Sequence, residues 1–175
     1  MSITTVVVTF YSRGGSTESL AHAAAVGAVQ ARALIRLRRM PDADEAAIVE
    51  RLVDCRDSLR RMHREYVAPR EADVLAAHAL VIGSPADLDP SSPEWAAFVD
   101  VLRRLQAEGK LAGKVAAVIA TGPSSDAFAT VVRQLGFATI TEADIDASGE
   151  MDDVGRAVAL GRKAALAAQA AKSTS

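Results

Sequence analysis

Short apolar runs alternate along the chain with longer segments in which apolar residues recur every three or four positions. Short runs rich in β-branched residues predict buried strands, and the longer periodic segments predict helices. The predicted strands are residues 6–10, 33–37, 79–83, 115–120 and 137–141. The predicted helices are residues 17–28, 44–66, 71–77, 92–106, 126–135 and 151–171. This alternation predicts an α/β fold, with a doubly wound, five-stranded parallel sheet in a three-layer arrangement.

The predicted helix at residues 44–66 has the most regular apolar stripe in the chain. Its stripe residues step by alternating fours and threes and are Ile48, Leu52, Cys55, Leu59, Met62 and Tyr66. A surface helix that packs on a sheet has this pattern, and so does a short coiled-coil seam between subunits. A helix of this length would extend about 30 Å, so part of the stripe would pass beyond the sheet. We therefore expect either a core face or a contact within a homodimer or tetramer.

Length and composition limit the possible classes of protein. The 175 residues suit a single domain spanning residues 1–175, and half of them are apolar, which is enough for one core. The formal net charge of −2 mixes both signs, so neither nucleic acid nor membrane is an expected partner. The single cysteine, the lack of a run of about 20 apolar residues and the lack of a signal-peptide pattern favour a cytoplasmic protein. The three histidines are far apart in the sequence, so no metal site is expected.

Three predicted loops follow the first, third and fourth strands, at residues 12–17, 84–91 and 121–126. All three are rich in glycine, serine, threonine, proline and aspartate. In an open parallel sheet, ligands bind beyond the carboxyl ends of the strands, where the strand order reverses. Because all three loops begin at that edge, together they form the predicted ligand site.

The first of these loops has the composition of a phosphate-binding turn. Gly14 and Gly15 allow the backbone to turn tightly, and the helix that follows presents its positive end to an anion. The sequence has neither the lysine-bearing P-loop motif nor G-x-G-x-x-G, which disfavours a nucleotide triphosphatase and a dinucleotide site. The alternative is a plain strand-to-helix turn in which Ser16 or Thr17 only caps the helix.

Three segments resemble the flavin loops of a known family. Residues 10–21, F-Y-S-R-G-G-S-T-E-S-L-A, resemble the phosphate loop of flavodoxin-like proteins. Residues 83–100, G-S-P-A-D-L-D-P-S-S-P-E-W-A-A-F-V-D, resemble the second flavin loop of NAD(P)H:quinone oxidoreductases of the Trp-repressor-binding-protein type, and A-T-G at residues 120–122 is similar to the start of their third loop. The resemblance runs from residue 6 to the last helix, with residues 40–70 matched poorly. It implies a flavodoxin-like fold, flavin mononucleotide (FMN) as cofactor, reduction of quinones by NAD(P)H, and assembly into oligomers.

The same resemblance implies which residues form the flavin site. The family's phosphate contacts carry over to Ser12, Gly15, Ser16 and Thr17, and Arg13 and Gly14 complete the candidate loop. The ring contacts carry over to Pro85, Ala86, Asp87 and Leu88 on one side and to Thr121 and Gly122 on the other. Asp87 and Leu88 stand where the family has an arginine and an aromatic residue. Carboxylates near the ring raise the cost of an anionic reduced flavin, so we expect FMN binding to be weaker than is usual in the family.

Three functions are compatible with these patterns. The first is an FMN-dependent NAD(P)H oxidoreductase acting on a quinone-like acceptor, in which the flavin carries the hydride and no side chain is assigned as catalytic. The second is a flavodoxin-type electron carrier, with FMN but no nicotinamide site. The third is a degenerate flavodoxin-like protein with weak or lost FMN binding, which the changes at Asp87 and Leu88 favour.

Overall fold

A parallel five-stranded sheet with strand order β2-β1-β3-β4-β5 forms the centre of the computed structural model, which describes residues 3–120, 123–145 and 151–173. The strands are β1 (Thr5–Phe10), β2 (Leu34–Arg39), β3 (Ala79–Ser84), β4 (Val115–Ala120) and β5 (Ala138–Ile140). The α-helices are α1 (Ser16–Gln30), α2 (Glu45–Arg51), α3 (Arg56–Glu65), α4 (Glu71–Ala76), α5 (Pro93–Ala107), α6 (Pro123–Gln134) and α7 (Asp153–Ser173). Two 3-10 turns are η1 (Val53–Cys55) and η2 (Glu142–Asp144). All five predicted strands are confirmed, with ends that differ by at most two residues.

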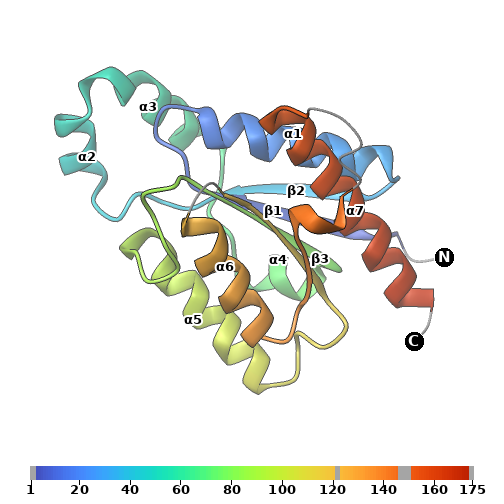
Figure 1. The fold of residues 1–175 in the computed structure, drawn as a ribbon. Helices are drawn as coiled ribbons and strands as arrows, with labels where there is room; N and C mark the ends of the chain where they lie inside the picture. Colours follow the sequence, from blue (N-terminus) through green and yellow to red (C-terminus); the bar gives the residue numbers. More distant parts are fainter. Residues whose placement is uncertain (1–2, 121–122, 146–150, 174–175) are drawn as a thin grey trace.

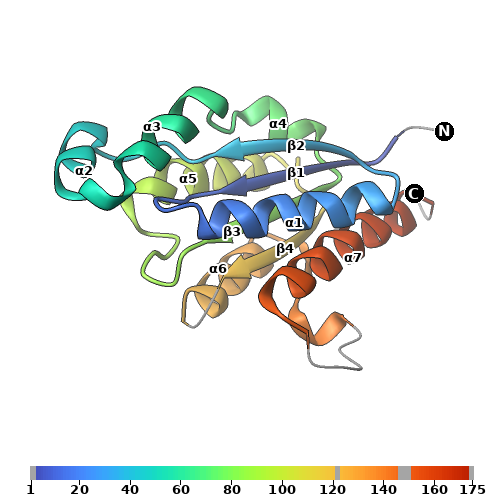
Figure 2. The ribbon, with the colours of Figure 1, turned by 90° about the horizontal axis from the view of Figure 1, so that it is seen from above.

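Helices cover both faces of the sheet, as the doubly wound prediction requires (Figure 1). Helices α1 and α7 lie on one face, and α4, α5 and α6 lie on the other (Figure 2). Successive residues of β1 point into opposite cores: Val6 and Val8 pack with α1 and α7, whereas Val7 packs with residues of α4, α5 and α6. Every residue of β1 and β3 is buried, because these central strands are covered on both sides.

The packing of α1 against α7 depends on two glycines. A Cβ atom at Gly27 would collide with the carbonyl of Val158, and one at Gly161 would collide with the backbone of Ala24. The two helices therefore approach at backbone distance. This contact fixes the position of α1, whose first turn begins the candidate site.

The prediction of one continuous helix at residues 44–66 is wrong, because the helix is interrupted in its middle. Leu52 leaves the helical conformation (φ −103°, ψ 67°), so the chain forms α2, η1 and α3 instead of one rod. Ile48, Leu59 and Met62 are all buried within the protomer, and Met62 joins the core between the sheet and α1. Tertiary packing can override a local helical pattern of this kind. Half of the six stripe residues are thus buried within the protomer, and the other three are partly buried.

No helix in the described ranges is both long enough and apolar enough to cross a membrane.

Candidate functional site

The first loop connects β1 to α1, and one glycine and one serine fix its shape. Gly15 has a φ of +100°, in the left-handed region that glycine adopts without steric cost. Its N–H donates to Ser12 Oγ over 3.1 Å, and its carbonyl accepts the bond from the N–H of Ser19. Ser12 is buried, whereas Gly14 and Ser16 are exposed. The accessible side of the turn therefore lies at the start of α1.

The start of α1 offers backbone donors instead of a side-chain cap. Gly15 is the N-cap and, as a glycine, has no side chain to cap the helix, so the interpretation of Ser16 or Thr17 as the capping residue is wrong. These two residues are instead the first two of the helix. The N–H groups of a first helical turn have no acceptor within the helix and form its positive end. Together with two hydroxyls, they make an arrangement suited to an anion.

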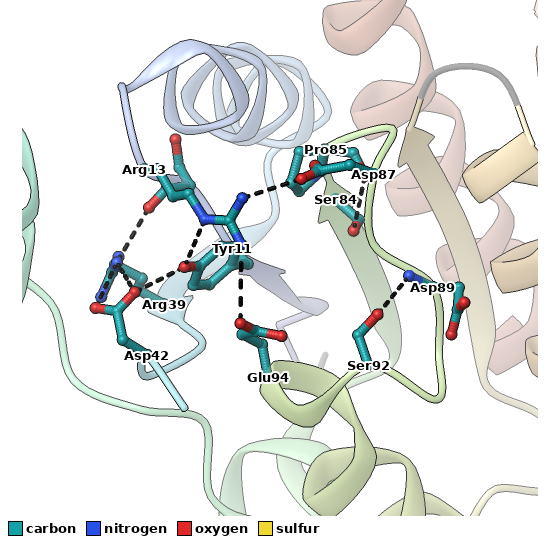
Figure 3. A network of polar contacts seen from close by, with 11 residues as sticks. Tyr11, Arg13, Arg39, Asp42, Ser84, Pro85, Asp87, Asp89, Ser92 and Glu94 are labelled. Carbon is teal, nitrogen blue, oxygen red and sulfur yellow. Dashed lines mark hydrogen bonds and ion pairs between the residues drawn. The ribbon is translucent and has the colours of Figure 1, made fainter. Parts of the chain in front are cut away.

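A buried ion pair supports this loop from behind. Arg39, at the end of β2, donates from Nη2 to the carbonyl of Ser12 at 3.0 Å and to Asp42 at 3.1 Å (Figure 3). Tyr11 donates to Asp42 over 2.7 Å, and burial raises the pKa of Tyr11 to about 12, with the bond to Asp42 as the next cause. Tyr11 therefore remains a neutral donor. The sequence interpretation missed Arg39 and Asp42, although charged residues just after the strand beside β1 reach the same edge of the sheet.

Arg13 extends from the first loop to the second. Its Nε donates to the hydroxyl of Tyr11 over 3.1 Å, and its Nη1 forms an ion pair with Asp87 at 3.0 Å. Its Nη2 lies 3.9 Å from a carboxylate oxygen of Glu94, the second residue of α5 (Figure 3). The guanidinium also stacks over the Tyr11 ring, 5.4 Å from its centre. Arg13 is therefore directed at the second loop and α5, away from the start of α1.

The second loop, between β3 and α5, has a buried and an exposed side. Ala86 and Asp87 are exposed and Pro85 is half-buried, so these three border the open edge of the sheet. Leu88 lies instead in the core that includes Trp95, and its carbonyl accepts a 2.6 Å bond from the hydroxyl of Ser124. Because its side chain points inward, Leu88 is placed to hold the loop rather than to contact a ring.

The described part of the third loop is tied to the second. Ser124, in the first turn of α6, is buried, and its bond to Leu88 joins the two loops at their base. Thr121 and Gly122, the predicted ring contacts on this side, lie outside the described residues. Trp95 is fully buried against Phe128, with ring centres 4.9 Å apart, so it acts as a packing residue here.

The two ends of the site differ in how well they suit FMN. The first loop fits a phosphate, because its glycine turn places the first N–H groups of α1 and the exposed Ser16 at an accessible helix start. Gly83 contributes to this fit, since a Cβ atom there would lie 3.4 Å from Thr17 Cγ2 and 3.2 Å from Phe10 Cβ. The second loop presents the carboxylate of Asp87, and Asp89 lies further along it, so the ring would meet negative charge that Arg13 offsets in part.

The described residues contain no group of three or more histidine, cysteine, aspartate or glutamate side chains arranged to hold a metal ion.

Comparison with known proteins connects this geometry to a family. The sequence profile of the family described as NADPH-dependent FMN reductase matches residues 5–137. NAD(P)H dehydrogenase (quinone) 3 of Rhizobium meliloti is 34% identical over 116 residues, which are 66% of this chain and 52% of that protein. NAD(P)H dehydrogenase (quinone) of Caulobacter vibrioides is 27% identical over 153 residues, covering 83% of this chain and 74% of that protein. The chain spans about half the length of several curated relatives that it matches.

Solved structures agree on the fold. The flavodoxin, WrbA-like protein from Agrobacterium tumefaciens superposes with a TM-score of 0.62 at 18% identity, covering 95% of this chain and 98% of that one. The observed strand order is the flavodoxin order, with its switch point between β1 and β3, where the first two loops begin. The family match and this fold together imply FMN as the cofactor. This flavodoxin-like chain belongs to the NADPH-dependent FMN reductase family.

Proposed function

We propose that this protein binds FMN through the loop at residues 12–17 and uses it to transfer electrons from NAD(P)H to a quinone-like acceptor. The observation that carries the proposal is the turn at Gly15, which leaves the first N–H groups of α1 available to an anion. The family description and the printed names of the relatives support the same activity.

Each part of the site has a defined task in this proposal. The backbone at Gly14–Thr17 and the hydroxyls of Ser12, Ser16 and Thr17 would hold the phosphate. Pro85, Ala86 and Asp87, with Thr121 and Gly122 opposite, would border the flavin ring. When bound, FMN would supply the hydride and electron chemistry, so the protein's role would be to bind, orient and tune it. No side chain is required as an acid or base.

A homodimer or tetramer in the cytoplasm belongs to the same proposal. The single cysteine is consistent with a reducing compartment. Because Leu59 and Met62 are buried in the protomer, the stripe of residues 44–66 gives less support to a seam than its sequence does. Exposed Val53 and Val67, which flank α3, are the apolar residues available nearby. Light scattering at tens of micromolar would test assembly, and a monomer at that concentration would contradict it.

A flavodoxin-type electron carrier is the second candidate function. The exposed carboxylates of Asp87 and Asp89 in the second loop favour it, since they would repel a negatively charged nicotinamide cofactor that approached this loop. An electron carrier would bind FMN but would not oxidise NAD(P)H. A degenerate protein would bind FMN weakly or not at all.

One experiment separates these three functions. The flavin-free protein is titrated with FMN, followed by quenching of flavin fluorescence, and the loaded protein is then mixed with NADPH or NADH and benzoquinone without oxygen. The proposed function predicts saturable binding and oxidation of the nicotinamide that depends on bound FMN. Binding without oxidation would favour the carrier, and no binding would favour the degenerate protein.

A further inference from the structure

Part of the segment that the family resemblance matches poorly, residues 40–70, folds beside the phosphate loop. Helix α3 lies near the N-terminal end of α1 in Figure 1, and hydrogen bonds from Arg61 and Tyr66 to Glu18 connect it to the first turn of α1. At the near end of α3, Cys55 Sγ stands 3.6 Å from the position that a Cβ atom of Gly14 would take. Residues 53–66 are therefore placed to influence what the loop binds.

The carboxylate of Glu18 lies beside the glycine turn of the first loop. Glu18, in the first turn of α1, is 7% exposed, and one of its oxygens lies 3.5 Å from the Cβ position of Gly15. A negative charge in a first turn stabilises the helix. The same charge opposes a second anion bound at that helix start, and partial burial weakens screening by solvent. Left unpaired, Glu18 would therefore disfavour a phosphate.

Arg61 of α3 pairs with this carboxylate on both oxygens. Its Nη2 and Nη1 donate to Glu18 over 2.6 and 2.9 Å, and Nη1 also donates to Glu65 over 2.7 Å. The hydroxyl of Tyr66 donates to Glu18 over 2.6 Å and lies 2.7 Å from Nε2 of His22. The Arg61 bond is the main reason that the pKa of Glu18 is lowered, so the carboxylate stays ionised and paired.

We infer that Arg61 is a positioning residue that gives the site its preference for a phosphorylated flavin. By holding and neutralising Glu18, it removes a charge that would otherwise repel the phosphate beside Gly15. The inference rests on the proposed function, and it predicts that Arg61 affects FMN but not riboflavin, which has the same ring and no phosphate.

The test measures Kd for FMN and for riboflavin by fluorescence quenching at low ionic strength. Arg61→Met should weaken FMN binding about tenfold and leave riboflavin binding within about twofold. The Glu18 carboxylate, left without its partner, would repel the phosphate of FMN, and riboflavin has no phosphate. Arg60→Met is the matched control, since it removes the same charge from the neighbouring exposed position of α3 and should change neither affinity. Arg61→Lys, which keeps the charge near Glu18, should recover most of the preference and is the milder variant if Arg61→Met unfolds.

A double-mutant cycle with Glu18→Gln identifies the mechanism. Arg61→Met in the Glu18→Gln background should have little effect on FMN, because no carboxylate then remains to neutralise. Equal losses for FMN and riboflavin in Arg61→Met would overturn the inference, and so would an unchanged FMN affinity in a parent that prefers FMN. A parent that binds FMN no better than riboflavin would contradict the phosphate loop itself, and the inference would fail with it.

Discussion

The first and second loops begin at the same edge of the sheet, but different kinds of contact determine their shapes. The backbone turn of the first is formed by its own residues, through the left-handed Gly15, the N–H bond to Ser12 and the start of α1, and Arg39 supports it from β2. The second is determined by distant residues, since Arg13 pairs with Asp87 and Ser124 holds Leu88. A loop formed by its own residues can be identified from sequence, whereas one shaped by partners far along the chain cannot. The difference also predicts that substitutions in the first loop have larger effects on flavin binding.

Thr17→Glu should give the largest effect. Thr17 is 5% exposed in the first turn of α1, and a carboxylate there would face the bound phosphate. We expect FMN affinity to fall by at least about 100-fold, because two like charges would meet in a partly buried site. FMN titration checks this, with Thr17→Gln as the control of equal size and no charge. An FMN affinity equal to the parent's in Thr17→Glu would contradict the phosphate assignment.

Gly15→Ala should have the next largest effect, because it strains the backbone of the turn. A side chain at φ +100° costs about 1–2 kcal/mol of folding stability, and relaxation of the strain would move the N–H groups of α1. We expect a lower melting temperature and FMN affinity reduced about tenfold. Gly14→Ala is the control, because its Cβ would make only an ordinary contact with Cys55. If both variants behaved alike, the conformation of Gly15 would not be what forms the site.

The sequence predicts the parts of this protein that are determined by neighbouring residues. The five strands, the loop edge and the glycine turn all follow from local pattern. The break at Leu52 does not, because it comes from packing of Leu59 and Met62 into the protomer. Pairs such as Arg61 and Glu18 are 43 residues apart, so only the fold brings them together. In the second loop, Leu88 is expected from the sequence to contact the ring but is buried in the core with Trp95, and only the fold brings that core together.

Asp87→Arg should have a smaller effect and in the opposite direction. Asp87 is 63% exposed at its side chain, so its pair with Arg13 contributes at most about 1 kcal/mol. Replacing it removes a carboxylate from the ring side and frees Arg13, so FMN should bind about three- to fivefold more tightly. Asp100→Arg on α5 makes the same charge change at another exposed site and should change affinity less. Adding Leu88→Phe to Asp87→Arg, to restore the family's aromatic residue, would not help, since overpacking a core position costs about 1–3 kcal/mol.

Tighter FMN binding in Asp87→Arg would show that charge limits the ring side. An unchanged affinity would mean that the second loop does not border the flavin. A parent that purifies with a full complement of FMN would contradict the expected weak binding and leave little for this substitution to gain.

The smallest effect that we predict is on the pH dependence of folding stability. It compares a carboxylate beside the first loop, Glu18, with one in the second loop, Asp87. The pKa of Glu18 is lowered, chiefly by the hydrogen bond from Arg61, so its folded form binds a proton less readily than its unfolded form. Its contribution to stability is therefore complete above the ordinary glutamate pKa, about 4.3, and is lost as the pH falls through the lower folded value. Glu18→Gln should lower the melting temperature at pH 6–8, and its difference from the parent should shrink below about pH 4.3. Asp87→Asn is the comparison from the second loop, and because Asp87 is exposed, this variant should follow the parent closely throughout. The measurement is thermal unfolding of the three flavin-free proteins between pH 3 and pH 8. A Glu18→Gln difference that stays constant to pH 3 would show that the ion pair with Arg61 does not stabilise the start of α1.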